Sequence, residues 1–186
     1  MSAADFEIRA EAPGDAPAIF GVQAAAFGRP DEARLVDALR GAVRPTVSHV
    51  AVMGARVVGH VLVTPVALET ERGAAPACGG LAPLGVEPAL QGRGMGGALV
   101  RSALAGAREL AWPAVFLLGN PAYYGRFGFE LAAPRGLRYE SAAFDTGFQV
   151  CFLQPGALDG IRGFVRYADA FASASGEPPP RRRQRR

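Results

Sequence analysis

The sequence predicts a mixed α/β (α+β) fold, in which a central sheet of about six to seven strands is flanked by about four helices. Residues 47–53 and 57–68 are rich in valine and predict two strands of a hairpin that turns at 54–56. Residues 81–86 predict a short buried strand, which a glycine-rich turn joins to an amphipathic helix over 98–110. Strands and helices therefore alternate along the chain, as in a sheet covered by helices.

The amino-terminal part predicts one strand and two helices. Residues 6–9 alternate between apolar and charged side chains, as a half-buried strand does. Asp15 is typical of a helix cap, and a Gly-Arg-Pro-Asp break at 28–31 ends that first helix. A second helix is expected over 31–40, with Asp31 as its cap.

The second half of the chain predicts more strands and one short helix. Residues 114–118 are entirely apolar, which indicates a central strand. Pro121 favours the first turn of a short helix that ends near residue 126. Residues 148–153 predict another strand, and 160–167 a last strand or an edge segment. Loops are expected over residues 69–80 and 135–147.

The glycine-rich turn carries the strongest functional signal. Its glycines can adopt positive φ and bring bare backbone close to a ligand. They are Gly92, Gly94, Gly96 and Gly97. Free N–H groups at the start of the next helix, the helix dipole and Arg93 together favour an anion, most simply a phosphate. A tight turn without a ligand is the alternative for any isolated loop of this kind.

Two other phosphate-binding motifs fit this turn poorly. Three of its glycines match the G-x-G-x-x-G dinucleotide fingerprint, but residues 87–91 separate them from the strand off which that fingerprint opens. No acidic residue stands about 20 positions further on, where a ribose would need one. The chain contains no lysine, which excludes a Walker-type loop.

Two blocks of the sequence resemble signatures of one acyltransferase superfamily, GNAT. Residues 91–96, QGRGMG, resemble its (Q/R)-x-x-G-x-(G/A) pyrophosphate loop. Residues 120–129, NPAYYGRFGF, resemble its helix-to-strand signature, although a glycine stands at 125 where glutamate is common. The run 81–129 is most similar to the bacterial subgroup of predicted acetyltransferases of the YhbS type.

This resemblance implies a GNAT fold and an acetyl-CoA-dependent N-acetyltransferase. The strands at 81–86 and 115–118 would be parallel neighbours that splay apart to admit the pantetheine arm. The pyrophosphate would lie on the backbone of the glycine-rich turn. The residues implied to bind acetyl-CoA are Leu84, Gly85, Val86, Gln91, Gly92, Arg93, Gly94, Met95, Gly96, Gly97 and Asn120. An amine would attack the thioester directly, and Tyr124 would be the catalytic residue that protonates the departing thiolate.

The general base and the acceptor stay open. Several relatives carry a glutamate early on the motif strand, but residues 78–82 include no carboxylate. Glu69, Glu71, His60 or a water molecule could accept the proton. The acceptor could be a small amine, an aminoacyl group or a protein amine. A non-catalytic acyl-CoA-binding or regulatory domain of the same fold is the alternative function.

Charge and composition restrict the partners. The formal net charge is +3, but five of the 20 basic residues are arginines at 181–186, and the remaining 15 face 17 acidic residues. We expect a single domain over 1–172 and a disordered tail rich in proline and arginine over 173–186. That tail lacks interleaved aromatic residues, which disfavours nucleic-acid binding.

Two cysteines, Cys78 and Cys151, predict neither a disulfide framework nor, with two distant histidines, a metal site. The sequence contains no run of 18 apolar residues and begins without a signal pattern. We therefore expect a cytoplasmic protein without a membrane partner. A homodimer is compatible with the sequence.

Overall fold

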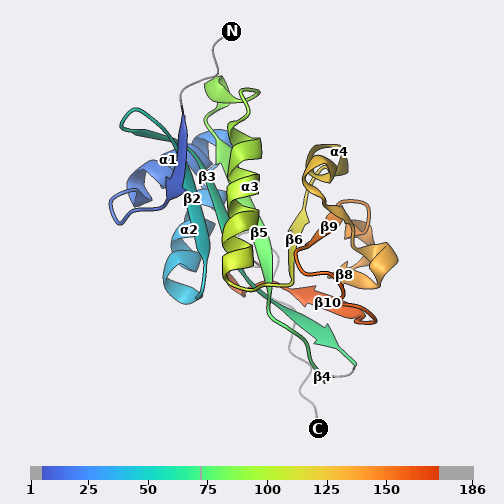
Figure 1. Cartoon of the computed structure of the whole chain (residues 1–186). Coiled ribbons are helices and arrows are strands. Elements are labelled where there is room, and N and C mark those ends of the chain that lie inside the picture. Colours follow the sequence, from blue (N-terminus) through green and yellow to red (C-terminus); the bar gives the residue numbers. More distant parts are fainter. Residues whose placement is uncertain (1–5, 72, 172–186) are drawn as a thin grey trace.

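The computed structural model describes residues 6–71 and 73–171 (Figure 1). These residues form four α-helices, namely α1 (Ala16–Phe27), α2 (Asp31–Ala42), α3 (Met95–Glu109) and α4 (Pro121–Tyr124). They also form ten strands, namely β1 (Glu7–Ala10), β2 (Val47–Met53), β3 (Arg56–Thr70), β4 (Gly73–Ala74), β5 (Cys78–Val86), β6 (Ala114–Leu118), β7 (Glu130–Leu131), β8 (Leu137–Tyr139), β9 (Phe148–Phe152) and β10 (Gly163–Arg166). No helix in these ranges is long and apolar enough to cross a membrane.

The strands form one mixed sheet. Its main row has the order β1-β2-β3-β5-β6-β9-β7, while β4 and β10 pair with β3, and β8 pairs with β10. Within the row only β5 and β6 are parallel, and every other neighbouring pair is antiparallel. The predicted α/β architecture with four helices is therefore confirmed, and three short strands are added beside the seven of the row.

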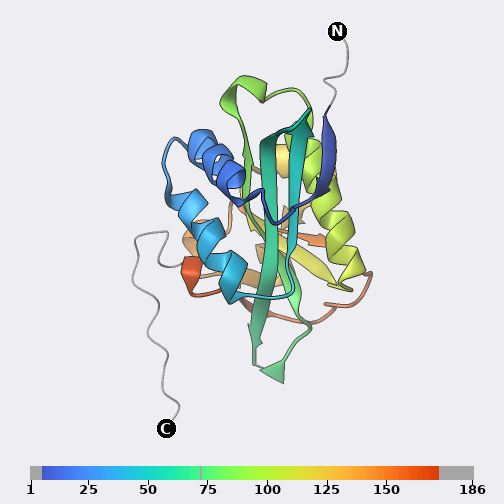
Figure 2. The same ribbon diagram turned by 90° about the vertical axis from the view of Figure 1, so that its left-hand side faces the viewer.

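Helices cover both faces of the sheet (Figure 2). On one face, Ile19 of α1 and Leu39 of α2 pack against Leu62 of β3 in a fully buried cluster. On the other face, Leu99 of α3 packs with Val61 of β3 in a larger cluster. Neighbouring residues of a strand point to opposite faces, so β3 supplies side chains to both layers. Every residue of β3 from Val57 to Thr64 is buried, so this strand lies at the centre of the molecule.

Two expected loops contain strands. β3 continues to Thr70, and β5 already begins at Cys78, so only part of 69–80 is loop. The reason is pairing, because the antiparallel ladder of β3 and β5 extends as far as Val66 opposite Cys78. The second expected loop, 135–147, contains β8, which pairs in parallel with β10. Long-range pairing therefore organises both segments despite their glycines and prolines.

The helix starts also differ from the expected ones. α3 begins at Met95, three residues before the expected start, so the end of the glycine-rich turn is already the first helical turn. Asp15 occupies the predicted cap position of α1, but its carboxylate binds Arg9 at 2.5 Å and makes no capping bond to the helix. Asp31 is the first residue of α2 and Pro30 occupies the cap position. The expected disordered tail, 173–186, lies outside the described residues.

Candidate functional site

The candidate site begins where β5 and β6 part. Their parallel pairing comprises two residue pairs, Gly79 with Val115 and Gly80 with Phe116. Beyond them β5 continues to Val86 alongside β3, while β6 continues alongside β9. Figure 1 shows the two strands diverging above this point. The predicted splayed pair is therefore confirmed.

A bulge in β5 lies beside the opening. Val61 of β3 stands opposite Leu84, and Val63 opposite Leu81, so two residues of β5 face one of β3 between these pairs. A bulge of this kind increases the local twist of the strand that carries it. The register shift therefore turns the end of β5 away from β6 while its ladder with β3 is kept.

The backbone of β5 directs polar groups into the gap. The N–H of Glu87 donates to the carbonyl of Val58 on β3 at 2.9 Å. Backbone groups alternate in direction along a strand, so those of Leu84 and Val86 point away from β3 and those of Gly85 toward it. The Val86 carbonyl accepts a bond from Nε2 of Gln91 at 3.1 Å. The peptide groups of Leu84 thus remain to pair with an extended ligand.

The glycine-rich turn presents the N-terminus of α3 beside this gap. Gly92 and Gly94 have φ of 75° and 90°, values that favour glycine. The N–H of Ala98 bonds the carbonyl of Gly94 at 3.0 Å, so the N–H groups of the three preceding residues lack partners within the helix. The exposed Arg93 contacts only the Ala89 carbonyl, at 3.4 Å, among the described residues. This terminus therefore suits an anion.

The second block packs directly onto the first. A Cβ placed on Gly96 would lie 2.6 Å from the hydroxyl oxygen of Tyr123, so a side chain at 96 would displace that hydroxyl. The buried Met95 anchors the same turn in the core. Asn120 caps α4, because its Oδ1 accepts the N–H of Ala122 at 2.9 Å. The Asn120 amide nitrogen is left to donate to a ligand.

Tyr124 lies half-buried on α4. Its ring makes edge contacts with the rings of Tyr123 and Phe129, at centroid distances of 4.9 and 5.8 Å. Burial, with a smaller effect of Tyr123, raises the pKa of Tyr124 to about 12. The phenol is thus protonated at neutral pH. No hydrogen bond engages its hydroxyl within residues 6–71 and 73–171.

Two residues that the sequence analysis missed support Tyr124. A Cβ on Gly119 would lie 2.5 Å from the Tyr124 ring, so the ring rests on bare backbone at that point. The buried Gln149 of β9 donates to the carbonyls of Gly119 and Gly147, at 3.0 and 3.2 Å. The sequence feature that could have indicated Gln149 is that it is a single polar residue within the apolar strand β9. Gln149 thus fixes the backbone on which Tyr124 lies.

The structure places the two glutamates considered as bases far from the gap. Glu69 lies near the end of β3 and pairs with Arg166 at 2.8 Å. It is eight residues from Val61, the partner of Leu84, which at about 3.3 Å per residue amounts to about 26 Å along the strand. Glu71 lies in the exposed turn that follows β3. Neither carboxylate can reach the opening between β5 and β6.

His60 lies on β3, where its buried side chain hydrogen-bonds to Gln23 of α1 and Ser48 of β2. Gln23 donates from Nε2 to its Nδ1 at 2.8 Å, so Nε2 carries the proton and donates to Oγ of Ser48 at 2.9 Å. Burial, with smaller effects of Arg40 and His49, lowers the pKa of His60 to about 3. The imidazole is therefore neutral and a weak base. Its contacts are those of a structural residue.

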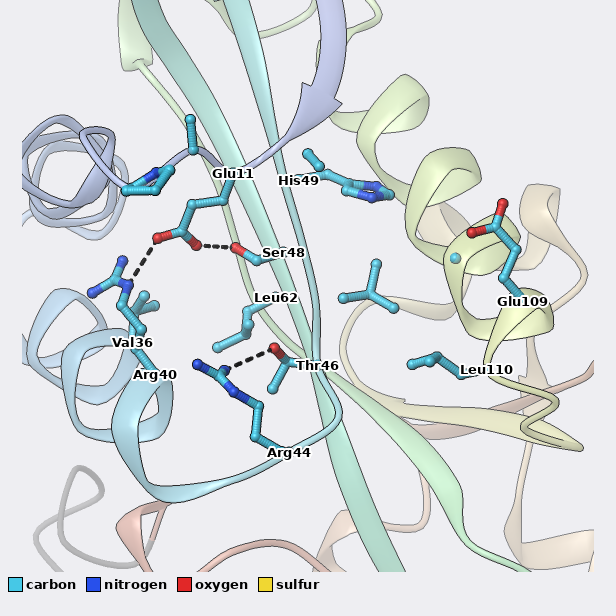
Figure 3. Close-up of a pocket in the computed structure, with 15 residues that line it drawn as sticks. Glu11, Val36, Arg40, Arg44, Thr46, Ser48, His49, Leu62, Glu109 and Leu110 are labelled. Carbon is cyan, nitrogen blue, oxygen red and sulfur yellow. Dashed lines mark hydrogen bonds and ion pairs between the residues drawn. The ribbon is translucent and has the colours of Figure 1, made fainter.

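A pocket of about 470 Å³ lies beside β2, on the amino-terminal side of the sheet (Figure 3). α2 supplies Arg40 on one side and α3 supplies Glu109 on the other. Glu11 accepts hydrogen bonds from Arg40 and from Ser48, and Ser48 connects the pocket to His60. The strands β3 and β5 separate this pocket from the gap. No group of three potential metal ligands occurs within the described ranges.

Comparison with known families decides the relationship. Residues 7–132 match the family described as "Acetyltransferase (GNAT) domain". The chain belongs to the GNAT acetyltransferase family. The resemblance inferred from the two sequence blocks is therefore confirmed, and the match spans the glycine-rich turn, the gap and α4 of this GNAT domain.

Relatives of this GNAT domain occur in Escherichia coli K12. It is 38% identical over 165 residues to the protein named "Uncharacterized N-acetyltransferase YhbS", covering 88% of this chain and 97% of the relative. It is 40% identical over 121 residues to "Uncharacterized N-acetyltransferase YjhQ", covering 64% and 66% of the two chains. The similarity to the YhbS subgroup is thus also confirmed.

Solved structures of the family include complexes with the cosubstrate. The E. coli YhbS structure in complex with CoA matches with a TM-score of 0.83 and 37% identity, over 92% of this chain and 94% of that one. A GNAT acetyltransferase from Brucella melitensis in complex with acetyl-CoA matches with a TM-score of 0.74 and 36% identity, over 90% and 99% of the chains. The predicted GNAT fold is therefore confirmed.

Proposed function

We propose that this protein transfers an acetyl group from acetyl-CoA to a primary amine by direct attack of the amine on the thioester. The observation that carries the proposal is the coincidence of three features. β5 and β6 part after two residue pairs, the N-terminus of α3 opens beside the gap, and Tyr124 lies just beyond the end of β6. Two relatives with 36–37% identity bind CoA or acetyl-CoA in their solved structures.

The donor would bind along β5. Its pyrophosphate would accept bonds from the N–H groups at the start of α3, with Arg93 adding positive charge. The amides of the pantetheine arm would pair with the peptide groups of Leu84 as an added strand. Asn120 would donate to the same arm from its free amide nitrogen. Gln91, bonded to the Val86 carbonyl, would hold the end of β5 in the shape that this pairing needs.

The reaction forms a C–N bond and breaks a C–S bond. As the amine nitrogen attacks the carbonyl carbon, an oxyanion develops, which the N–H of Leu84 or Val86 would stabilise. Collapse of the tetrahedral intermediate expels the thiolate. Tyr124 would donate its phenolic proton to that sulfur, and the amine would lose a proton to solvent.

Water is the proton acceptor that the geometry supports best among the four candidates. Glu69 and Glu71 lie near the far end of β3, and His60 is buried, neutral and held by two hydrogen bonds. A primary amine that reaches the site in its neutral form needs no protein base before it attacks. The acetylation rate should then rise with pH as the free amine of the acceptor becomes more abundant.

A screen of primary amines with acetyl-CoA tests the proposal. Purified protein is incubated with single amines, amino-acid amides and peptides, and both free CoA thiol and acetylated product are measured. We expect thiol release in equal amount to one acetylated amine.

The same screen addresses the alternative of a non-catalytic acyl-CoA-binding domain. The absence of a carboxylate early on β5 favours that alternative. If calorimetry shows that acetyl-CoA binds but no amine of the panel causes thiol release, the protein is a non-catalytic acyl-CoA-binding domain and the proposed enzyme activity is wrong. Absence of binding would contradict both functions.

A further inference from the structure

The arginines near α3 differ in their partners from most of the other arginines that the structure describes. Eight arginines in the described ranges form ion pairs with carboxylates, namely Arg9, Arg29, Arg34, Arg40, Arg56, Arg135, Arg138 and Arg166. Arg93, Arg101 and Arg126 form none there, and all three are exposed. Their positive charges are therefore not neutralised by any described residue.

Two of these guanidinium groups lie on a pair of aromatic rings. Arg126 lies 4.2 Å from the centroid of the Tyr123 ring and 4.9 Å from that of Phe127. Arg101, on α3, lies 5.8 Å from the same Phe127 ring. A guanidinium that stacks on a ring face keeps its N–H groups directed outward in its own plane. The shared ring thus brings two unpaired cations to one place on the surface.

This place adjoins the first turn of α3. A Cβ on Gly97 would lie 3.3 Å from the Phe127 ring and 3.6 Å from Nη1 of Arg101. A Cβ on Gly96 would lie 2.6 Å from the Tyr123 hydroxyl oxygen. The arginine pair therefore stands beside the N–H groups that are proposed to bind the pyrophosphate, and separate from Arg93 in the preceding turn.

The number of positive groups exceeds what a pyrophosphate requires. The N–H groups at the helix N-terminus and the Arg93 guanidinium are already enough to bind the two negative charges of a pyrophosphate. Two further guanidiniums held together without a counter-ion repel each other, and a doubly charged phosphate would relieve that repulsion. CoA carries such a group, the 3′-phosphate of its ribose, a few bonds from the pyrophosphate.

We propose that Arg101 and Arg126, held on the rings of Tyr123 and Phe127, recognise the 3′-phosphate of the acyl-CoA donor. This inference rests on the proposed function. The two guanidiniums make the protein select acetyl-CoA over acetyl-dephospho-CoA, which lacks only that phosphate. They are specificity-determining residues for the donor and take no part in the chemistry of the thioester.

Calorimetry with both donors tests the proposal. Wild-type protein should bind acetyl-dephospho-CoA about tenfold or more weakly than acetyl-CoA, within the usual worth of charge-assisted bonds to phosphate. The double variant Arg101→Ala, Arg126→Ala should bind both donors with equal affinity. Arg108→Ala is the matched control, since Arg108 is an exposed arginine near the other end of α3 and also forms no ion pair within residues 6–71 and 73–171. It should keep the preference of the wild type.

The outcomes separate this inference from the proposed function. Equal affinity of the wild type for both donors, or an equal loss for both in the double variant, would overturn the recognition of the 3′-phosphate while leaving acetyl-CoA binding intact. Failure of the wild type to bind either donor would overturn the proposed function itself. Thermal melting of each variant checks its folding, which exposed side chains should leave unchanged.

Discussion

Replacement of Tyr124 by phenylalanine tests the proposed proton donor with little change to the fold. Phenylalanine keeps the ring that contacts Tyr123, Phe129 and the Gly119 backbone. The lost hydroxyl has no hydrogen-bond partner in the described part of the chain, so the change leaves no group unsatisfied. The free energy of unfolding should stay within about 0.5 kcal/mol of the wild type.

The pKa of Tyr124 sets the size of the catalytic loss. With that pKa raised to about 12, complete transfer of its proton to a thiolate of pKa about 8.5 is uphill by roughly 5 kcal/mol. Proton transfer from Tyr124 should therefore be incomplete in the transition state, where the phenol acts mainly through the hydrogen bond that it donates to the departing sulfur. We expect the lower end of the range for general acids, about a hundredfold fall in kcat or about 2.7 kcal/mol.

Steady-state kinetics at saturating acetyl-CoA and amine measure this loss. kcat should fall while the affinity for acetyl-CoA is kept, because the proton is needed only in the transition state. Tyr123→Phe, next to it on α4, should cost much less. The wild-type rate should show no decline between pH 8 and about 10, because the raised pKa keeps Tyr124 protonated there. Near wild-type turnover of Tyr124→Phe, with chemistry rate-limiting, would refute the assignment.

Three further substitutions test separate parts of the structure. Gly94→Glu should abolish the binding of acetyl-CoA measured by calorimetry, because the φ of 90° strains any side chain and a carboxylate repels phosphate. Unchanged affinity for acetyl-CoA would contradict the proposal that the glycine-rich turn binds the pyrophosphate. Gln149→Leu should lower the free energy of unfolding by about 1–3 kcal/mol in denaturant titrations, since it leaves the carbonyls of Gly119 and Gly147 without their donor, and kcat should fall with it. The pKa of His60 is lowered from 6.5 to about 3, so the unfolded chain alone takes up this proton as the pH falls below 6.5, and stability should drop by about 1.4 kcal/mol per pH unit from this residue. His60→Gln should flatten that dependence, and an unchanged slope between pH 7 and 5.5 would contradict it.

Local patterns in the sequence were enough to predict the main elements and the family. Hydrophobic periodicity, which is a property of neighbouring residues, predicted three of these elements. They are the apolar strand at 114–118, the valine-rich hairpin and the helix after the glycine-rich turn. The two motif blocks predicted the relationship because a phosphate-binding turn needs glycine at fixed positions, and Gly92 and Gly94 do adopt positive φ. These features depend on a few consecutive residues and so can be seen in the chain itself.

Contacts between distant segments determined the rest. The end of β3 and the start of β5 were mistaken for loop because their order comes from cross-strand pairing, which local propensity does not contain. Asp15 does occupy the cap position of α1, but its carboxylate binds Arg9 and makes no capping bond to the helix. The cap expected of Asp31 was wrong, because Pro30 occupies that position and Asp31 is the first residue of α2. Long-range pairing therefore decided where several elements begin and end.

The sequence by itself was enough to predict which residues form the candidate site, namely the end of the motif strand at Leu84 to Val86, the glycine-rich turn, Asn120 and Tyr124. Only the tertiary structure decided how they are held. It placed Gln149 under Gly119, set Tyr123 against Gly96, and moved Glu69 about 26 Å along β3 from the level of the gap. The physical reason is that a motif fixes the chemistry and local conformation of a segment, whereas distance, burial and pKa depend on which other segments pack against it.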